Sequence, residues 1–203
     1  GDDLSTLEYG DETIDAFELG VKTTLLENRL ELNATLFHST IDNLQVSQFD
    51  GAVGFNVSNA AQATSQGFEL DSRFALTEQL QAFASLAYLD YSYDQYDEAP
   101  CNQPQANAFW RENGTVNGCS QDLKGKTVIQ APDWSGAFGL SFSAPLGEQL
   151  GLNATLDANF RDDHFMAGDL DPQTKQDATW LFNAQLSVGD VSGNWRLALI
   201  GKN

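Results

Sequence analysis

Hydrophobic and polar side chains alternate with a period of two along most of this chain. Between positions 151 and 161, the apolar residues Leu152, Ala154, Leu156, Ala158 and Phe160 are each followed by a polar residue. Similar alternation recurs around positions 17–21, 30–36, 68–74, 134–142, 180–188 and 195–199. Successive side chains of a strand point to opposite faces, whereas a helix groups residues three and four apart on one face. The pattern therefore predicts strands with one apolar and one polar face.

The alternation and the turn residues between the segments predict eight strands. We place them at about 12–26, 29–48, 56–76, 79–93, 128–144, 149–165, 177–190 and 194–201. Short connections at Glu27-Asn28, Thr77-Glu78, Gly147-Glu148 and Ser192-Gly193 alternate with long ones at 48–56, 94–126 and 166–176. In an up-and-down meander, this alternation puts every tight turn at one end of the sheet and every long loop at the other.

The lengths of these strands favour a membrane protein. Many exceed the mean of about five or six residues in soluble proteins and also the roughly 9–11 residues that cross a bilayer. We therefore expect an all-β fold, a segment of an antiparallel up-and-down transmembrane β-barrel with short periplasmic turns and long extracellular loops. Two alternatives remain open at this point: a soluble β-sandwich, in which the apolar face packs on a second sheet, and a small autonomous outer-membrane barrel, adhesin- or porin-like.

In a barrel, the apolar face contacts lipid and the polar face lines the lumen. The charged residues in the polar register, predicted to face the lumen, are Glu18, Lys22, Glu31, Glu69, Asp71, Arg73, Asp157 and Arg161. Aromatic residues near the strand ends suit interfacial girdles. They are Phe17, Trp134, Phe160, Trp180 and Trp195.

The charge balance narrows the possible partners. The 203 residues include 29 acidic and 10 basic side chains, which give a net charge of −19. A nucleic-acid-binding protein needs a basic face, so we expect no nucleic-acid partner. Many acids lie before the first strand or in the long loops, at the end of the sheet opposite the tight turns. They make an acidic rim of solvated loops, or a surface for a divalent cation or a cationic ligand.

Two cysteines lie in the longest predicted loop. Seventeen residues separate Cys101 from Cys119, and a lone pair cannot form a four-ligand zinc site. They are either two unrelated free thiols or a disulfide that closes a surface loop, and the disulfide implies an oxidising compartment. Asp169-Leu170-Asp171 and the Asp94–Asp97 pair lack the spacing of a calcium loop, so no metal site is assigned.

A series of short motifs resembles the barrel of TonB-dependent receptors. The series starts with the strand Glu12–Lys22 and the segment Asn28–Phe37, continues with Asn59-Ala60 and Gly67-Phe68-Glu69, and ends with Ala131–Ser135 and Gly201-Lys202-Asn203. Each motif is weak alone, but their order and spacing span nearly the whole chain. The family's barrel has about twenty-two strands around a plug. The resemblance implies that residues 1–203 form a later part of such a barrel, with the plug domain, the TonB box and the final strands absent.

The resemblance also implies a function and its partners. A scarce nutrient (a ferric siderophore, haem, cobalamin or a carbohydrate) would bind the extracellular loops and the plug, and the TonB complex would drive its import without covalent chemistry. The expected partners are outer-membrane lipid and lipopolysaccharide, the rest of the barrel and the plug, and the nutrient. We expect a protein of the Gram-negative outer membrane with no enzymatic activity and no cofactor. In agreement, the chain has no nucleophile elbow and no zinc-binding helix.

Candidate ligand contacts lie in the long loop that contains the cysteines. They are Tyr93, Tyr96, Phe109, Trp110 and Arg111. Exposed aromatic rings stack on sugars and flat chelates, but the alternative is a loop that packs its own aromatic side chains. The histidines, His38 near a strand end and His164 at a strand-to-loop junction, are expected to be ordinary surface or loop residues and not haem ligands.

Overall fold

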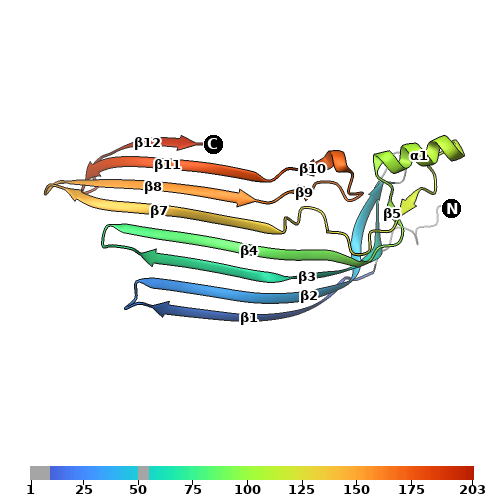
Figure 1. Ribbon diagram of the computed structural model, residues 1–203, viewed down its shortest axis with the longest axis horizontal. Helices are drawn as coiled ribbons and strands as arrows, with labels where there is room; N and C mark the ends of the chain where they lie inside the picture. The colour runs from blue at the N-terminus through green and yellow to red at the C-terminus, as the bar shows by residue number, and fades with distance from the viewer. Residues whose placement is uncertain (1–9, 50–54) are drawn as a thin grey trace.

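Eight long strands form one antiparallel sheet in the order β1-β2-β3-β4-β7-β8-β11-β12 (Figure 1). The computed structural model describes residues 10–49 and 55–203. The strands are β1 (Thr13–Leu25), β2 (Leu30–Phe49), β3 (Phe55–Ala75), β4 (Leu80–Gln95), β7 (Trp134–Leu146), β8 (Leu150–Arg161), β11 (Thr179–Asp190) and β12 (Arg196–Lys202). The eight predicted strands and their antiparallel meander are confirmed. Within the described residues the sheet is open, with β1 and β12 at its two edges.

The short and long connections separate to opposite ends of the sheet, as the alternation of loop lengths predicts (Figure 1). The tight turns owe their shape to local conformation. Leu26, Glu27 and Asn28 all have positive φ angles, of 53°, 57° and 67°. In the next turn, the Thr77 hydroxyl accepts hydrogen bonds from the backbone N–H groups of Gln79 and Leu80 at 3.1 and 3.0 Å. Residues in the left-handed conformation, and hydroxyl groups that accept backbone hydrogen bonds, allow a chain to reverse direction within a few residues.

The strand register gives the sheet one apolar and one polar face. A row of directly paired residues on the apolar face consists of Leu19, Leu36, Phe68, Tyr88 and Trp134. Side chains on this face are strongly exposed, up to 75% for Leu199. In the described chain the other two sheets have only two strands each, so no second sheet covers this face as a sandwich would require. An apolar surface of this extent needs lipid or another apolar partner.

Aromatic rings gather on the apolar face towards the end with the long loops. Phe68, Tyr88 and Trp134 contact one another, with ring centroids 4.9–6.0 Å apart. Phe160 and Trp180 pair at 4.7 Å. Trp195 lies at the opposite end, directly before β12, and is exposed. The positions suit the predicted girdles at two membrane interfaces, because Trp and Tyr concentrate at these levels.

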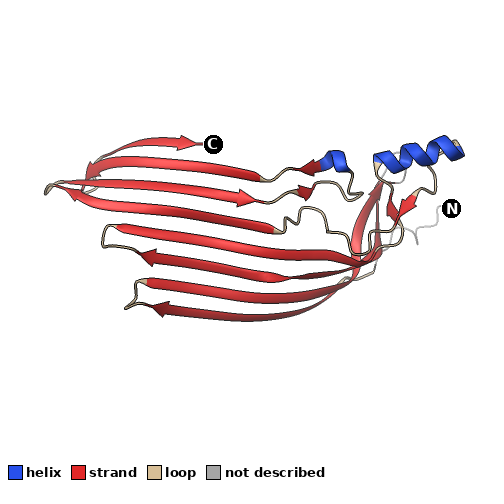
Figure 2. Cartoon of the chain, viewed as in Figure 1, coloured by secondary structure: helices blue, strands red, loops and turns tan. Residues whose placement is uncertain are grey.

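The long loops contain short elements that the alternation did not predict (Figure 2). The loop after β4 carries β5 (Ala99–Pro100), α1 (Gln103–Asn113) and β6 (Ser120–Gln121). The loop after β8 carries β9 (His164–Phe165), a 3₁₀ helix (Pro172–Thr174) and β10 (Lys175–Gln176). No helix among the described residues is long and apolar enough to span a membrane.

Two predicted strands had a wrong boundary. The strand placed at 149–165 ends at Arg161, and His164–Phe165 form the separate β9. The strand placed at 128–144 begins only at Trp134. The segment before it still runs beside β4, where Val128 and Leu89 donate backbone hydrogen bonds to Tyr91 and Asp133 respectively. However, Gln130 has a φ angle of 56°, which interrupts a regular ladder, and Pro132 lacks an N–H group.

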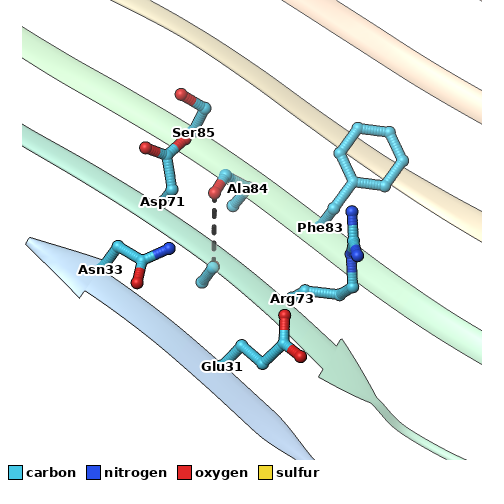
Figure 3. Close-up of a pocket in the computed structure, with 8 residues that line it drawn as sticks. Glu31, Asn33, Asp71, Arg73, Phe83, Ala84 and Ser85 are labelled. Carbon is cyan, nitrogen blue, oxygen red and sulfur yellow. Dashed lines mark hydrogen bonds between the residues drawn. The ribbon is translucent and has the colours of Figure 1, made fainter. Parts of the chain in front are cut away.

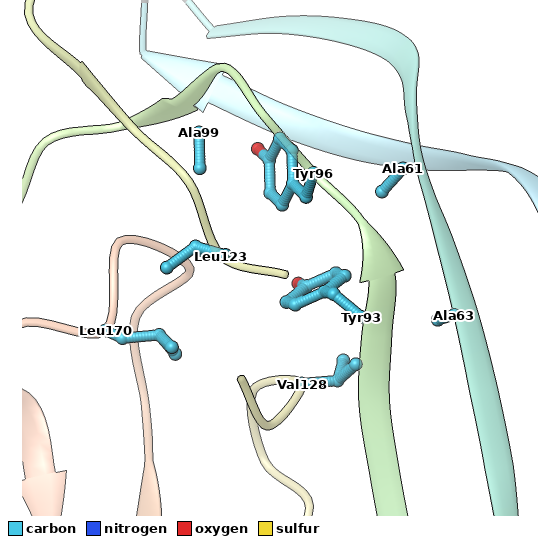
Figure 4. Close-up of a cluster of buried hydrophobic side chains, with 8 residues drawn as sticks. All are labelled: Ala61, Ala63, Tyr93, Tyr96, Ala99, Leu123, Val128 and Leu170. Carbon is cyan, nitrogen blue, oxygen red and sulfur yellow. The ribbon is translucent and has the colours of Figure 1, made fainter. Parts of the chain in front are cut away.

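The buried core lies where the long loops meet the ends of β3 and β4 (Figure 4). It consists of Ala61, Ala63, Tyr93, Tyr96, Ala99, Leu123, Val128 and Leu170, with Leu44, Val46, Tyr91, Ile129 and Phe165 packed against it. Ala63 pairs with Ile41 and Tyr93, and Ser65 pairs with Tyr91, in the register of the polar face. The two long loops therefore fold together over the polar side of β2, β3 and β4.

Candidate functional site

Local sequence signals explain the helix of the long loop. Asn102 caps α1 through a reciprocal pair of hydrogen bonds with Gln105: its side chain accepts from the Gln105 N–H at 3.1 Å, and its own N–H donates to the Gln105 side chain at 3.0 Å. Gly114 ends the helix in the left-handed conformation. This capping box, together with a proline in the first turn, is the signal that could have predicted α1 from the sequence.

A disulfide and a two-residue ladder close the loop around α1. Cys101 and Cys119 are bonded, so the two are not free thiols. Beside them, β5 and β6 pair Ala99 with Gln121 and Pro100 with Ser120. The Gln121 side-chain amide donates to the backbone oxygens of Pro100 and of Asp169 at 2.7 Å each. The second contact joins this loop to the loop after β8.

Asp171 makes a second connection between the two loops. Asp171 is only 5% exposed, and its side chain accepts two backbone hydrogen bonds. One carboxylate oxygen accepts from the first residue of α1, Gln103, at 2.9 Å, and the other accepts from Gln173 at 2.8 Å. One buried carboxylate thus caps both α1 and the 3₁₀ helix, where helix N-termini favour a negative charge.

A cavity of about 820 Å³ lies between these loops and the strands below them. Its lining from the strands consists of Leu44, Gln45 and Val46 of β2 and Tyr91 and Tyr93 of β4. The loops contribute Tyr96, Pro100, Cys101, Gln103, Ala106, Val116, Cys119, Val128, Ile129, Ala167, Gly168 and Asp169. This volume lies in the range of about 300–1,000 Å³ that is typical of small-molecule sites, and such sites combine apolar walls with a few polar groups.

The structure divides the five predicted ligand contacts into two groups. Tyr93 and Tyr96 line the cavity and belong to the core, with exposures of 4% and 2% and ring centroids 5.1 Å apart. The expectation that these two rings are exposed for stacking is therefore wrong, because the loops cover them. Trp110 is 57% exposed, and it lies on α1 beside Phe109 and Arg111, outside the cavity lining. Whether any of the five binds a ligand stays a prediction.

Several cavity residues were not predicted from the sequence. Leu44, Val46, Val128 and Ile129 read as strand residues, and only the folding of the loops brings them together. The position of Tyr91 could have been noticed in the sequence. Tyr91 shares the polar register with Tyr93, and an aromatic side chain is unexpected in a register that is predicted to line a lumen.

The polar face also forms a smaller hollow of about 280 Å³ (Figure 3). Glu31, Asn33, Asp71, Arg73, Phe83 and Ser85 line it, together with Ser72 and Ala84. All eight residues predicted to face the lumen share this face. One row of paired residues contains Glu31, Arg73, Phe83, Gly139 and Asp157. Their orientation towards a lumen remains a prediction, since the sheet is open.

Two phenylalanines on the polar face lie over glycines of the neighbouring strand. Phe83 pairs with Gly139, and a Cβ atom at Gly139 would lie 2.2 Å from the Phe83 ring. Phe37 pairs with Gly67, where the corresponding distance is 2.9 Å. An aromatic ring laid over a cross-strand glycine shields the exposed backbone and fixes the register. These rings therefore have a structural reason to occupy the polar register.

Neither histidine is part of a metal site in the described residues, which contain no group of three or more His, Cys, Asp and Glu side chains placed to hold an ion. His38 approaches the Gln66 side chain at 3.3 Å in the register of the apolar face. His164 is buried in β9, with its Nδ1 atom 3.1 Å from the Asp162 carbonyl oxygen. His164 is thus more buried than an ordinary loop histidine.

Acidic side chains dominate the loop end electrostatically. Burial raises the pKa of Asp133, and the neighbouring carboxylates of Asp162 and Asp90 raise it further. One base is held nearby: Lys175 forms an ion pair with Asp163. The hydrogen bond from Lys175 lowers the pKa of Asp163, and the same bond raises the pKa of Lys175.

Comparisons with known proteins show which family has this architecture. The family model of the TonB dependent receptor-like β-barrel matches residues 2–203. This chain belongs to the TonB-dependent receptor β-barrel family. The family's members are outer-membrane transporters and not enzymes. The predicted family is therefore confirmed.

Individual relatives agree with the family match. The metal-pseudopaline receptor CntO of Pseudomonas aeruginosa is 33% identical over 90 residues, which cover 44% of this chain and 12% of the relative. The ferric yersiniabactin receptor FyuA of Yersinia pestis has a TM-score of 0.61 at 15% identity, covering 94% of this chain and 28% of that structure. The siderophore receptor PiuA of Acinetobacter baumannii has a TM-score of 0.64 at 20% identity, covering 92% and 23%. The chain thus spans about an eighth of the curated relative and about a quarter of these structures, which share its fold.

Proposed function

We propose that this chain is a barrel segment of an outer-membrane receptor that binds a scarce nutrient and imports it with energy transmitted by TonB. The cavity of about 820 Å³ carries the proposal. It lies at the loop end of the sheet, on the polar face, where a ligand entering from outside the cell first meets the barrel. Its size and its tyrosine-rich, mostly apolar wall suit a small chelate or cofactor.

The two faces of the sheet fit the remaining partners of this receptor. The apolar face, with its aromatic rings near the loop end, would contact lipid and lipopolysaccharide in the Gram-negative outer membrane. The open edges at β1 and β12 would pair with further strands of the same barrel, because a bilayer does not tolerate unpaired strand edges. The polar face with its alternating charges would surround a plug domain, through which the TonB complex acts.

A pair of neighbouring substitutions on α1 tests the role of the cavity. Ala106 lines the cavity, whereas Ala108 is exposed on the same helix and lies outside the cavity lining. In the full-length receptor, we expect Ala106→Trp to fill the cavity and abolish uptake, while Ala108→Trp leaves uptake unchanged. Uptake would be followed in cells supplied with ferric chelates, haem, cobalamin or a carbohydrate as the limiting nutrient.

Two controls complete the experiment. A protonophore should stop uptake by the unmodified receptor, since the proposed import needs the inner-membrane proton gradient. Surface labelling of intact cells would check that both variants reach the outer membrane. Equal uptake by the two tryptophan variants would contradict a ligand site in this cavity, and uptake that persists with the protonophore would contradict energised import.

A further inference from the structure

The polar side chains that line the cavity are neutral or negatively charged. Among the described residues that line it there are three phenols, two side-chain amides and one carboxylate, and there is no lysine, arginine or histidine. The carboxylate is that of Asp169, one of whose oxygens accepts the Asp171 N–H at 3.1 Å. The wall therefore offers neutral hydrogen-bonding groups, a single negative charge and an aromatic surface that comes mainly from the half-buried Tyr91, because Tyr93 and Tyr96 are almost completely buried.

The surrounding loops do not supply the missing positive charge. Segments 96–133 and 162–178 carry ten carboxylates against four basic side chains. The acids are Asp97, Glu98, Glu112, Asp122, Asp133, Asp162, Asp163, Asp169, Asp171 and Asp177, and the bases are Arg111, Lys124, Lys126 and Lys175. Of the four bases, Lys175 is paired with Asp163, and none belongs to the described lining of the cavity.

The charge of the wall limits the ligands that can bind. An anion transferred from water into this cavity would lose its hydration without gaining a positive partner, which is costly for a single charge and more costly for several. A neutral chelate loses much less. A cation gains from the partly exposed Tyr91 ring, from the Asp169 carboxylate and from the field of the acidic loops, which raises its local concentration.

On the basis of the proposed function, we infer that the receptor takes a metal chelate that is neutral or positively charged and partly apolar, and that this cavity discriminates against polyanionic chelates. The tyrosine and aliphatic wall contacts the organic part of the chelate. Asp169 recognises a positive charge on it.

Three ferric chelates of similar size test this inference on the full-length receptor in detergent. They are a neutral trishydroxamate, a monocationic trishydroxamate that carries a free ammonium group, and a trianionic triscatecholate. We expect the first two to bind and the triscatecholate to bind at least roughly 100-fold more weakly, measured by quenching of intrinsic fluorescence. Added salt should weaken binding of the monocation and leave the neutral chelate unaffected.

A conservative substitution then tests Asp169 itself. Asp169→Asn keeps an oxygen for the Asp171 N–H and removes the charge. We expect this substitution to weaken binding of the monocationic chelate by roughly 5- to 10-fold and to leave binding of the neutral chelate unchanged. Asp177→Asn is the matched control, because Asp177 is an exposed acid of the same loop outside the cavity lining.

The outcomes separate this inference from the proposed function. Binding of the triscatecholate as tightly as the neutral chelate would overturn the charge selectivity and leave the receptor function standing. Equal losses in Asp169→Asn and Asp177→Asn would overturn the role of Asp169. If none of the three chelates binds, the assignment of a metal chelate fails, and the Ala106→Trp comparison with other nutrients decides separately whether the chain imports a ligand.

Discussion

At the scale of single residues, the pairing of Phe83 with Gly139 shows how close approach fixes the register of the sheet. A Cβ atom at Gly139 would also lie 2.8 Å from the Leu156 carbonyl oxygen, so the space is closed by backbone as well as by the ring. We expect Gly139→Val to destabilise the receptor by about 1–3 kcal/mol, because overpacking forces rotamer and backbone shifts. The midpoint of urea unfolding in lipid vesicles measures this effect.

Gly151 of β8 provides the control for that substitution. A Cβ atom there meets nothing within 4 Å, so Gly151→Val should shift the unfolding midpoint little. The double substitution Phe83→Ala with Gly139→Val should recover part of the loss by opening the space that the ring occupies. Equal destabilisation by the two valine substitutions would show that β-branching, and not the ring contact, sets the cost.

Asp171 is the second residue whose role depends on its exact contacts. Asp171→Ala would remove the carboxylate that accepts the N–H groups of Gln103 and Gln173, and the loss of a hydrogen bond to a charged group costs about 1.5–3 kcal/mol. We expect amide hydrogen exchange in α1 and the 3₁₀ helix to accelerate by roughly 10- to 100-fold, with no change in β8. Asp177→Ala should leave the same amides protected, and faster exchange in that control would assign the effect to lost loop charge.

At the scale of elements, the sequence was sufficient to predict the strands but not to predict how the long loops fold. Each strand of the sheet repeats its pattern every two residues, so apolar positions such as Leu152, Leu156 and Phe160 identify both the strand and its face. The burial of Tyr93 and Tyr96 could not be predicted in this way. It depends on residues of distant segments, such as Leu123 and Leu170, that meet only when both long loops fold over the strands.

The disulfide-closed loop is the element whose stability can be changed independently. For a ring of this size, loop-closure entropy predicts a stabilisation of about 3 kcal/mol, mainly through the unfolded loop. We therefore expect Cys101→Ser with Cys119→Ser to let α1 open, and limited proteolysis to cut between positions 103 and 118 much faster than in the parent receptor. The eight long strands should stay protected, because their ladders do not involve either cysteine. Cleavage at an unchanged rate would show that β5, β6 and Asp171 suffice to hold the loop.

At the scale of the whole molecule, the sheet is organised by two faces and two ends. In the proposed receptor, the apolar face would contact lipid and the polar face the barrel interior, with the tight turns at the periplasmic end and the long loops at the outer surface. The core (Figure 4) and the cavity both lie at the loop end, and the strand residues Ala63, Tyr91 and Tyr93 that contribute to them share the polar register. The part of the molecule with the densest packing of its own is therefore the part proposed to bind the ligand, whereas the strands depend on partners outside the described sheet.

This dependence predicts how residues 1–203 behave in isolation. Only one side of β1 and one side of β12 are paired in the described sheet, and the exposed apolar face includes Leu197 and Leu199 beside one of these edges. Unpaired N–H and C=O groups cost several kcal/mol each in lipid, so the isolated segment should not insert as a monomer. We expect size-exclusion chromatography in detergent to show β-rich oligomers that pair edge to edge, whereas co-expression with the remaining barrel strands should give a single species of the mass of the full receptor. A monomeric, protease-resistant segment in vesicles would contradict this view, since it would mean that the eight strands close on themselves and that the open edges are not where the rest of the barrel joins.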